Sequence, residues 1–404
     1  MRALADRMGR IGESVTSATT AKAKALRDAG HHVINFAAGE LDAGSPPSAG
    51  AAAAAAAHHE RLHHYGPQSG LPELRQAVAE HLDPGDGSVR AENVLITSGT
   101  KQAVFHAIFA LIGPGDDVLL PAPYWTSYPS MIHLAGGTPV EVFAGWEHGF
   151  KVDVDMLERA ATDRTKMLIF TSPANPTGAL YSPDETRAIG EWAARRGIAV
   201  LSDEIYDRLV FSPHHFQSIA DLVPELRDRC LRTGGVGKSF AMTGWRIGWL
   251  TGSATLIRSI GALQSHTTGH PSNIAQAATL AVIQNGESDW LAKTRESLDR
   301  RRQTMLDGLR AIPGLVCLEP AGAFYVFPSV EAYLGKEVAG RQVSSSLELA
   351  EILLTEAQVA VIAGEAFGAP GYLRLSYALD DTDLAEGIDR ISRLLTTSRP
   401  FGVK

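Results

Sequence analysis

Short, almost continuous apolar runs alternate with longer segments of mixed polarity through the middle of the chain. Apolar residues fill most of 94–97, 117–120, 167–170 and 198–201, and glycine, proline or polar residues bound each run. Runs of this length and setting are typical of buried strands. The segments between them, such as 101–111, have the length and patterning of helices. Strands that alternate with helices from residue 94 to residue 250 predict a parallel sheet covered on both sides.

After residue 250 the pattern changes to a long helical stretch, from 273 to about 311, and then to short strands. These strands are expected near residues 316, 324–327, 359–362 and 373–375, with helices that begin at 346 and 381. We therefore predict an α/β fold with a mostly parallel, helix-covered sheet in a large domain, plus a smaller α+β domain. The expected division is an N-terminal arm packing with the small domain (1–45), a large domain (46–285) and a small C-terminal domain (286–404). Ligands should bind between the domains, where the carboxyl ends of the strands open.

Composition narrows the class of protein. The chain has 404 residues, 45% hydrophobic content and a net charge of −8, so it can bury two cores and has no basic footprint for nucleic acid. We expect no nucleic-acid binding and no membrane span, because neither a signal-peptide-like start nor an uncharged apolar stretch of about 18 residues occurs. A regulatory protein with a DNA-binding module would need an additional N-terminal segment, which we do not expect here. Two cysteines, Cys230 and Cys317, do not form a disulfide framework, which favours the cytoplasm.

Adjacent histidine pairs raise the question of a metal site. They lie at 31–32, 58–59, 63–64 and 214–215. His59 and His63 are spaced to share a helix face beside the alanine-rich helix expected at 51–57. Nothing nearby completes a three-ligand set. We therefore predict a solvated face and no metal.

Lys238 lies in the glycine-rich run GGVGKSFAMTGWRIG, residues 234–248, which admits two phosphate chemistries. A nucleotide-binding loop needs a glycine six residues before the lysine, and Arg232 stands there. A helix starting at Lys238 would also meet Gly244 in its interior, where glycine is poorly tolerated. The alternative is a Schiff base between Lys238 and pyridoxal phosphate, with Arg246 as a clamp for the cofactor phosphate. That hypothesis predicts further residues elsewhere.

The cofactor's ring nitrogen needs a carboxylate, and its ring oxygen needs hydrogen-bond donors. Asp203 ends an apolar strand, where an acid is costly unless a cation pairs with it. Tyr206 follows three residues later, and Asn175 is restricted by the proline after it. Taken singly, Asn-Pro is usually a turn and Asp-Glu after a strand is often a helix cap. Their order and spacing together indicate one site.

The motifs NPTG at 175–178, SDEIY at 202–206 and the run around Lys238 together resemble the fold-type I pyridoxal-phosphate aminotransferases, specifically the bacterial aspartate aminotransferase-like branch of class I/II. The resemblance extends over nearly the whole chain. It implies Lys238 as the Schiff-base lysine and catalytic proton carrier, and Asp203 on the pyridine nitrogen. It also places Tyr206 and Asn175 on the phenolic oxygen and Arg246 on the phosphate.

The resemblance assigns further residues around the cofactor. A helix that begins near residue 100 presents its first N–H groups as an anion site, and Gly99, Thr100 and Lys101 would supply the phosphate with backbone donors. Trp125 would stack on the pyridine face. Tyr65 is similar to the tyrosine that reaches the phosphate in the neighbouring subunit. A homodimer with shared active sites is therefore the expected assembly.

Substrate recognition should begin with an arginine that holds the carboxylate of an amino acid through two hydrogen bonds. Arg374 lies in an apolar strand pattern and is the candidate, while Gly39, Trp125 and Asn175 match other substrate-binding positions of the family. The implied reaction moves an amino group from an L-amino acid to a 2-oxo acid by a ping-pong mechanism.

The donor stays open between aspartate and an aromatic amino acid. By resemblance, Lys101 and Thr16 are candidates for a second substrate carboxylate, but the segment 265–270, which matches a region near the substrate side chain, carries no arginine. A lyase, decarboxylase or cyclase on the same scaffold is the alternative activity.

Two departures from the family pattern bear on the site. Gly235 stands where many relatives have a phosphate-binding serine, which predicts looser cofactor binding. The segment 39–44 lacks the usual proline and aromatic residue, which predicts a wider or more mobile entrance.

Overall fold

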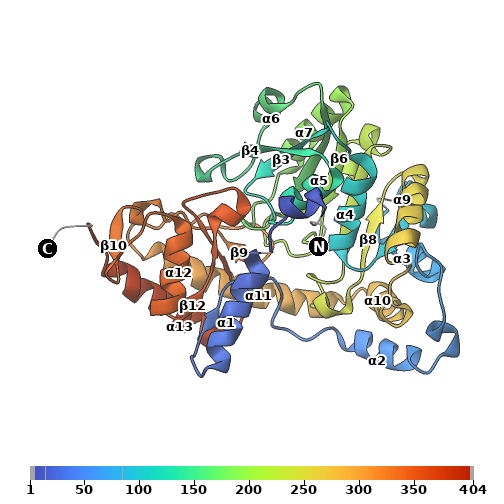
Figure 1. Ribbon diagram of the computed structural model, residues 1–404. Helices are drawn as coiled ribbons and strands as arrows, with labels where there is room; N and C mark the ends of the chain where they lie inside the picture. The colour runs from blue at the N-terminus through green and yellow to red at the C-terminus, as the bar shows by residue number, and fades with distance from the viewer. Residues whose placement is uncertain (1–4, 14, 84, 401–404) are drawn as a thin grey trace.

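A computed structural model describes residues 5–13, 15–83 and 85–400 of the chain (Figure 1). The large lobe is built on a seven-stranded sheet with the order β2-β8-β7-β6-β5-β3-β4. Only β8 runs against its neighbours, and the other strands are parallel to one another. The strands of this sheet are β2 Val94–Thr97, β3 Asp117–Ala122, β4 Thr138–Phe143, β5 Thr165–Thr171, β6 Ala199–Asp203, β7 Cys230–Gly235 and β8 Gly248–Thr251. The predicted α/β class with a mostly parallel sheet is confirmed.

Helices cover both faces of this sheet (Figure 1). Successive residues of a strand point to opposite faces of the sheet, and because helices cover both faces, every residue of the run is apolar. In β5, Met167 and Ile169 pack with α4, α5 and α9, whereas Leu168 and Phe170 pack with α7. The helices of the large lobe are α2 Pro47–Ala56, α3 Pro72–Leu82, α4 Thr100–Leu111, α5 Tyr128–Ala135, α6 Val154–Ala160, α7 Pro183–Arg196, α8 Ile219–Leu222, α9 Ala254–Thr267 and α10 Asn273–Asn285. Short 3-10 helices are η1 Asp6–Arg10, η2 Glu60–His63, η3 Ala91–Asn93, η4 Trp146–His148, η5 Pro224–Leu226 and η6 Thr243–Trp245.

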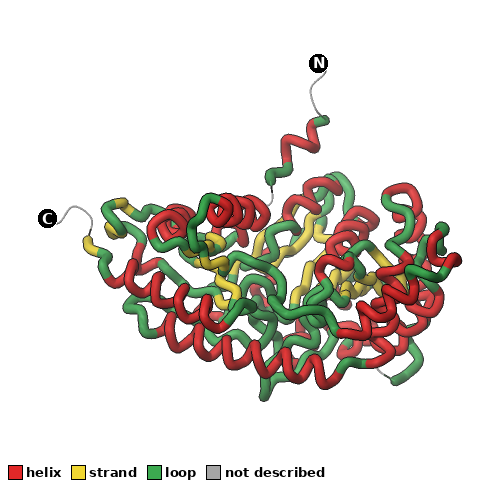
Figure 2. The backbone as a smooth tube through the Cα atoms, turned by 90° about the horizontal axis from the view of Figure 1, so that it is seen from below, coloured by secondary structure: helices red, strands yellow, loops and turns green. Residues whose placement is uncertain are grey.

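The small lobe lies beside the large one and combines three small sheets with long helices (Figures 1 and 2). Its strand orders are β13-β14-β9, β11-β10-β15 and β1-β12. Its strands are β1 Ile34–Asn35, β9 Tyr325–Val326, β10 Lys336–Val338, β11 Arg341–Gln342, β12 Val359–Ala360, β13 Ile362–Ala363, β14 Leu373–Ser376 and β15 Arg399–Pro400. Its helices are α1 Val15–Asp28, α11 Ser288–Arg310, α12 Ser346–Glu356 and α13 Asp381–Thr396, with 3-10 helices η7 Glu331–Tyr333 and η8 Gly364–Phe367.

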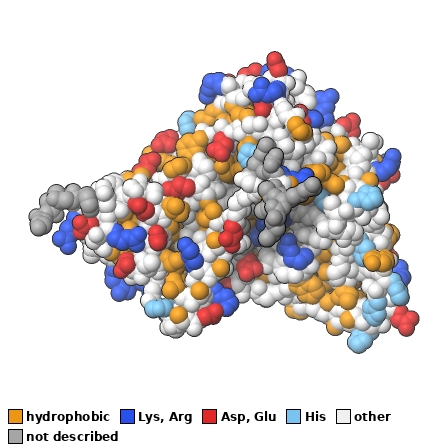
Figure 3. All heavy atoms as spheres, in the orientation of Figure 1, with side chains coloured by type: hydrophobic (Ala, Val, Ile, Leu, Met, Phe, Trp, Pro, Cys, Tyr) orange, Lys and Arg blue, Asp and Glu red, His pale blue; other side chains and the backbone are white. Residues whose placement is uncertain are grey.

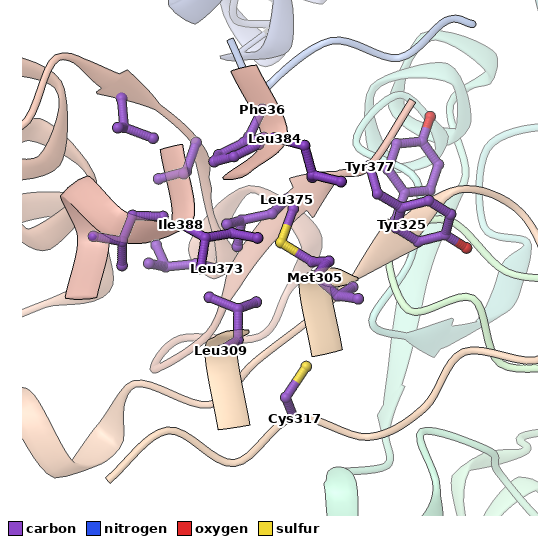
Figure 4. Close-up of a cluster of buried hydrophobic side chains, with 14 of the residues drawn as sticks. Phe36, Met305, Leu309, Cys317, Tyr325, Leu373, Leu375, Tyr377, Leu384 and Ile388 are labelled. Carbon is purple, nitrogen blue, oxygen red and sulfur yellow. The ribbon is translucent and has the colours of Figure 1, made fainter. Parts of the chain in front are cut away.

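The core of the small lobe combines residues 34–41 with the C-terminal part of the chain. Phe36 packs with Met305, Leu375 and Ile388 in one buried cluster, in which Tyr325 lies on the side toward the large lobe (Figure 4). Strand β1 pairs in parallel with β12, and α1 contacts β12 and β13. The N-terminal arm therefore belongs to the small lobe over these elements. The boundaries at 45/46 and 285/286 stay predictions, and residues 1–4 and 401–404 lie outside the described residues.

Three local predictions need correction. The stretch from 273 to 311 is two helices, because Gly286 and Glu287 both adopt a positive φ between α10 and α11. The strand expected at 359–362 is two short strands, and Val316 forms only an isolated bridge with Ser329. His59 precedes the 3-10 helix η2, so it does not share an α-helix face with His63.

The surface carries acidic and basic side chains interspersed on the face shown in Figure 3, and histidines gather near the alanine helix α2. None of the helices in the described part of the chain is both long and apolar enough to cross a membrane.

Candidate active site

A cavity of about 330 Å³ opens between the two lobes, at the carboxyl ends of the parallel strands. Its walls come from the ends of β5 and β6, the start of α4, the loop after β7, and strands β9 and β14 of the small lobe. Twelve of the thirteen residues that the sequence singled out for the site line this cavity. They are Thr16, Gly39, Gly99, Thr100, Lys101, Trp125, Asn175, Asp203, Tyr206, Lys238, Arg246 and Arg374.

Lys238 projects into the cavity from the loop after β7, and its amine donates a hydrogen bond to the carbonyl of Gly39. Burial lowers the pKa of Lys238 to about 8, and the positive charge of Arg374 acts in the same direction while Glu40 opposes it. The amine therefore loses its proton far more readily than an ordinary lysine does. A neutral amine is both a nucleophile and a base.

Asp203 ends β6 and is 5% exposed. Its Oδ2 accepts a 2.7 Å hydrogen bond from the hydroxyl of Tyr128, and its Oδ1 accepts one from the N–H of Ile205 at 3.3 Å. Burial raises the pKa of Asp203, and these donors partly offset that effect. Among the described residues no cation forms a salt bridge with Asp203, whereas the adjacent Glu204 is paired with Arg232 at 3.0 Å. Asp203 is thus a buried carboxylate that fits a cationic ligand atom.

Arg374 reaches the cavity from β14 and is 2% exposed. Its Nη1 donates to Asn175 Oδ1 at 3.0 Å, its Nη2 donates to the carbonyl of Ala37 at 2.8 Å, and its guanidinium lies 4.5 Å from the centre of the Tyr325 ring. Its Nε is buried and has no acceptor among the described residues. A fixed guanidinium with an unsatisfied N–H suits an anionic ligand.

The opposite side of the cavity concentrates donors and positive charge at the start of α4. Gly99 has a φ of +82°, and a Cβ there would lie 2.6 Å from Arg246 Nη2, so only glycine lets that guanidinium pack on the helix start. The Thr100 hydroxyl donates to the carbonyl of Gly234 at 2.8 Å, which fixes the first turn. Lys101 lies over the Trp125 ring, 5.1 Å from its centre, and burial followed by Arg246 lowers the Lys101 pKa. Helix N–H groups beside two cations fit a phosphate.

The close packing around residue 235 explains why glycine, rather than the serine found in many relatives, occupies this position. A Cβ at this position would lie 2.7 Å from Thr100 Oγ1 and 3.0 Å from the carbonyl oxygen of Ile247. A serine there would push against the first turn of α4.

Sequence reasoning missed three residues of the site, Tyr128, Thr171 and Tyr325. Tyr128 and Thr171 lie beside Asp203, and the Tyr325 hydroxyl is 3.1 Å from that of Tyr206. Tyr128 follows Trp125 by three residues, so proximity in the sequence could have suggested it. Tyr325 has no comparable local signal, because its partner lies in the other lobe.

Tyr65 is the one predicted residue that does not line the cavity. Its side chain is 100% exposed, and its ring makes an edge-to-face contact with His270. Its contact with a neighbouring subunit stays a prediction.

Comparison with known proteins decides the family. Residues 31–391 match the family model described as aminotransferase class I and II. The chain belongs to this family. It is therefore an aminotransferase, a transferase of nitrogenous groups. Membership of this class implies pyridoxal phosphate as the cofactor, and the donors, the buried carboxylate and the lysine of the cavity fit that group.

The similarity extends over the full length of the relatives. The chain is 49% identical to the aspartate aminotransferase of Streptomyces avermitilis, over 98% of both chains. It is 42% identical to the aspartate/prephenate aminotransferase of Cereibacter sphaeroides, over 97% of this chain and 98% of the relative. Among solved structures, the aspartate aminotransferase of Rhizobium meliloti matches with a TM-score of 0.94 at 36% identity, over 99% of this chain and 100% of that one.

Proposed function

We propose that this family member is a pyridoxal-phosphate-dependent aspartate aminotransferase that moves the amino group of L-aspartate to a 2-oxo acid. The observation that carries the proposal is the cavity itself. It combines a lysine amine of lowered pKa, a buried carboxylate without a cationic partner among the described residues, and two separate cationic regions, Arg374 on one side and Lys101 with Arg246 on the other.

The cofactor, when bound, supplies an aldehyde for the amino group and a protonated ring that accepts electron density from the substrate's α-carbon. Lys238 is the residue that would hold it covalently. Asp203 would pair with the ring nitrogen, and Tyr206 would donate to the ring oxygen. Arg246 and the first N–H groups of α4, at Gly99, Thr100 and Lys101, would hold the phosphate, with Trp125 against the ring.

Asn175 would contact both Arg374 and the cofactor in this arrangement. Its Oδ1 accepts from Arg374, and its NH2 group has no acceptor among the described residues. The amide can therefore orient the guanidinium with its oxygen and donate to the ring oxygen with its nitrogen.

Proton transfer is assigned to Lys238. Once the substrate's amino group has displaced it from the cofactor, the neutral amine would take the proton from the substrate's α-carbon and deliver it to the cofactor's aldehyde carbon. Arg374 would hold the substrate carboxylate through two parallel hydrogen bonds. The carbonyl of Gly39 accepts a hydrogen bond from this amine.

The dicarboxylate preference rests on relatives and on the second cationic region. The aspartate aminotransferase of Thermus thermophilus, 38% identical with a TM-score of 0.91, has been solved with maleate, which is a dicarboxylate. Here Lys101, Thr16 and Ser17 line the cavity. We assign the side-chain carboxylate of the substrate to Lys101.

Transfer involving prephenate is a second candidate, because a relative from Cereibacter sphaeroides is named aspartate/prephenate aminotransferase and one from Aquifex aeolicus is named probable aspartate/prephenate aminotransferase. Initial rates with oxaloacetate, 2-oxoglutarate and prephenate as acceptors would separate the two. A kcat/KM for prephenate near that for oxaloacetate would favour the second candidate.

We further propose a homodimer that shares its active sites through Tyr65, and a cytoplasmic location. The exposed side chain of Tyr65 supports the first part. Cys230 and Cys317, both buried and free of disulfides, suit a reducing compartment.

The test is an absorption spectrum of the protein loaded with pyridoxal phosphate, repeated after adding single L-amino acids without a 2-oxo acid. L-Aspartate should convert the lysine-bound cofactor to pyridoxamine phosphate, and oxaloacetate should appear in equal amount. Conversion by L-phenylalanine or L-alanine but not by L-aspartate would contradict aspartate as the amino donor and assign the enzyme to another class of amino acid. Release of ammonia or carbon dioxide would contradict the transamination. Lys238→Ala should lose the covalent band.

A further inference from the structure

Tyr128, the first residue of α5, forms part of the cavity wall next to Asp203. It is 1% exposed, and its ring meets the indole of Trp125 edge to face at 5.2 Å. Its hydroxyl lies 2.7 Å from Asp203 Oδ2 and 3.0 Å from Thr171 Oγ1. One tyrosine therefore contacts both the residue proposed for the ring nitrogen and the residue proposed for the ring face.

The direction of these hydrogen bonds follows from the number of protons. An ionised carboxylate only accepts, so the single hydroxyl proton of Tyr128 goes to Asp203. The Tyr128 oxygen must then accept from the hydroxyl of Thr171. The result is a chain of donors from Thr171 through Tyr128 to Asp203. Thr171 and Asp203 are register partners on β5 and β6, so the sheet itself fixes their separation.

We propose that Tyr128, supported by Thr171, is a positioning residue for the aminotransferase reaction: it holds Asp203 ionised and aimed at the ring nitrogen of the cofactor. This inference rests on the proposed function. It assigns the hydroxyl a task that packing does not require, since phenylalanine would fill the same space and keep the contact with Trp125.

The geometry leaves room for the ring nitrogen. Ile205 donates to Asp203 Oδ1, Tyr128 donates to Oδ2, and the hydroxyl of Thr233 also hydrogen-bonds to this carboxylate. A carboxylate has about four acceptor positions, so a ring N–H can be added without displacing any of these donors.

Tyr128 keeps its proton under working conditions. Burial and the negative charge of Asp203 hold the pKa of Tyr128 well above its ordinary value. The hydroxyl therefore stays a donor throughout the neutral and mildly alkaline range.

The test compares Tyr128→Phe with Thr171→Val and Thr171→Ser. Tyr333→Phe is the matched control, because Tyr333 is also 1% exposed and donates one hydrogen bond, to Pro313, in the small lobe. Three quantities are measured for each variant. They are the dissociation constant of pyridoxal phosphate from titration of the apoenzyme, the pH midpoint of the lysine-bound absorption band, and the rate of the half-reaction with L-aspartate.

For Tyr128→Phe we expect the dissociation constant to rise about ten-fold, the scale of one hydrogen bond to a charged group. The pH midpoint should move upward, because a ring nitrogen less firmly protonated withdraws less electron density from the bonded lysine nitrogen. The half-reaction should slow by roughly ten-fold or more, while the KM for L-aspartate changes little. Thr171→Val should show the same changes to a smaller degree, and Thr171→Ser, which keeps a hydroxyl, should show clearly smaller changes than Thr171→Val.

An unchanged pH midpoint and dissociation constant in Tyr128→Phe would overturn the inference. The inference would also fail if Tyr128→Phe lowered the melting temperature of the apoenzyme and weakened cofactor binding but left the pH midpoint unchanged, because that result indicates a general loss of stability. Equal behaviour of Thr171→Val and Thr171→Ser would remove the part assigned to Thr171. Failure of the proposed function would look different, because the unchanged protein would then form no lysine-bound band or would not react with L-aspartate.

Discussion

At the residue scale, the amine of Lys238 is the group whose chemistry the structure changes most directly. Its pKa of about 8 arises from burial and from Arg374, so the neutral fraction should grow as the pH rises through 8 rather than through the ordinary lysine range. We predict that acetylation of Lys238 in the apoenzyme, followed by mass spectrometry, has its midpoint near pH 8. A midpoint above 10 would contradict the prediction.

Neighbouring charges provide a signed control for this prediction. Arg374 lowers the pKa of Lys238 and Glu40 raises it. Arg374→Gln should therefore move the acetylation midpoint upward, and Glu40→Gln should move it downward. Shifts in the same direction would show that the variants act through structure rather than through charge.

Lys101 is predicted to discriminate between substrates. If its ammonium holds the side-chain carboxylate of aspartate, Lys101→Met should raise the KM for L-aspartate about 10- to 100-fold, the scale of a charge-assisted hydrogen bond. The KM for L-alanine, which has no second carboxylate, should change far less. Initial-rate kinetics at saturating cofactor measure both. Equal changes for the two amino acids would assign Lys101 to the cofactor instead.

The sequence pointed to residues that line the cavity where a local motif contains them, and it missed residues that only a tertiary contact brings there. Lys238, Asp203 and Asn175 lie in local motifs, and all three line the cavity. Thr171 and Tyr325 were missed because their partners become neighbours only when strands pair or lobes meet. A single sequence contains no local pattern for such contacts.

At the element scale, the start of α4 rests on glycines of the two strands beneath it. A Cβ at Gly248 on β8 would lie 2.4 Å from the backbone nitrogen of Thr100 and 2.7 Å from the carbonyl carbon of Gly99. A Cβ at Gly235 on β7 would meet Thr100 Oγ1. The close approach of helix and sheet at this point sets where the first N–H groups of α4 lie.

Gly248→Ala should therefore displace the first turn of α4. We predict a loss of about 1 to 3 kcal/mol in the free energy of unfolding, as for other overpacked sites, and weaker binding of pyridoxal phosphate. Denaturant unfolding of the apoenzyme and cofactor titration measure the two effects. Gly244→Ala is the control, since a Cβ there meets nothing within 4 Å. Unchanged cofactor affinity in Gly248→Ala would show that the position of the helix start does not matter.

Elements themselves were predictable where apolar periodicity marks them. The apolar runs at 94–97 and 167–170 lie within β2 and β5, as expected. The break at Gly286 and Glu287 was missed because helical patterning continues on both sides of it. The division at 359–363 depends on two different partners, since β12 pairs with β1 and β13 with β14. Such a division is a tertiary effect.

At the scale of the whole molecule, a segment from the first tenth of the chain packs with the C-terminal part in one lobe. Ile34 lies opposite Val359 in the parallel pair β1-β12, and Phe36 packs in the same core as Leu384 and Ile388 (Figure 4). The sequence predicted that the arm packs with the smaller lobe but could not supply this register, because strands this short carry no periodic signal. The arm's Gly39 carbonyl then reaches Lys238 of the other lobe.

The proposed sharing of active sites between subunits has a sharp test by complementation. Lys238→Ala should inactivate a site from within its own subunit, and Tyr65→Ala should weaken the site of the partner. When the two variants are unfolded together in equal amounts and refolded, half of the dimers should be mixed, and each would contain one site with both native residues. About a quarter of all sites should then be fully native, so activity should return to roughly a quarter of that of the unchanged protein. Each variant refolded alone is the control. Activity no higher than the mean of the two controls, in a mixture shown by native mass spectrometry to contain mixed dimers, would show that Tyr65 serves its own subunit or no site at all.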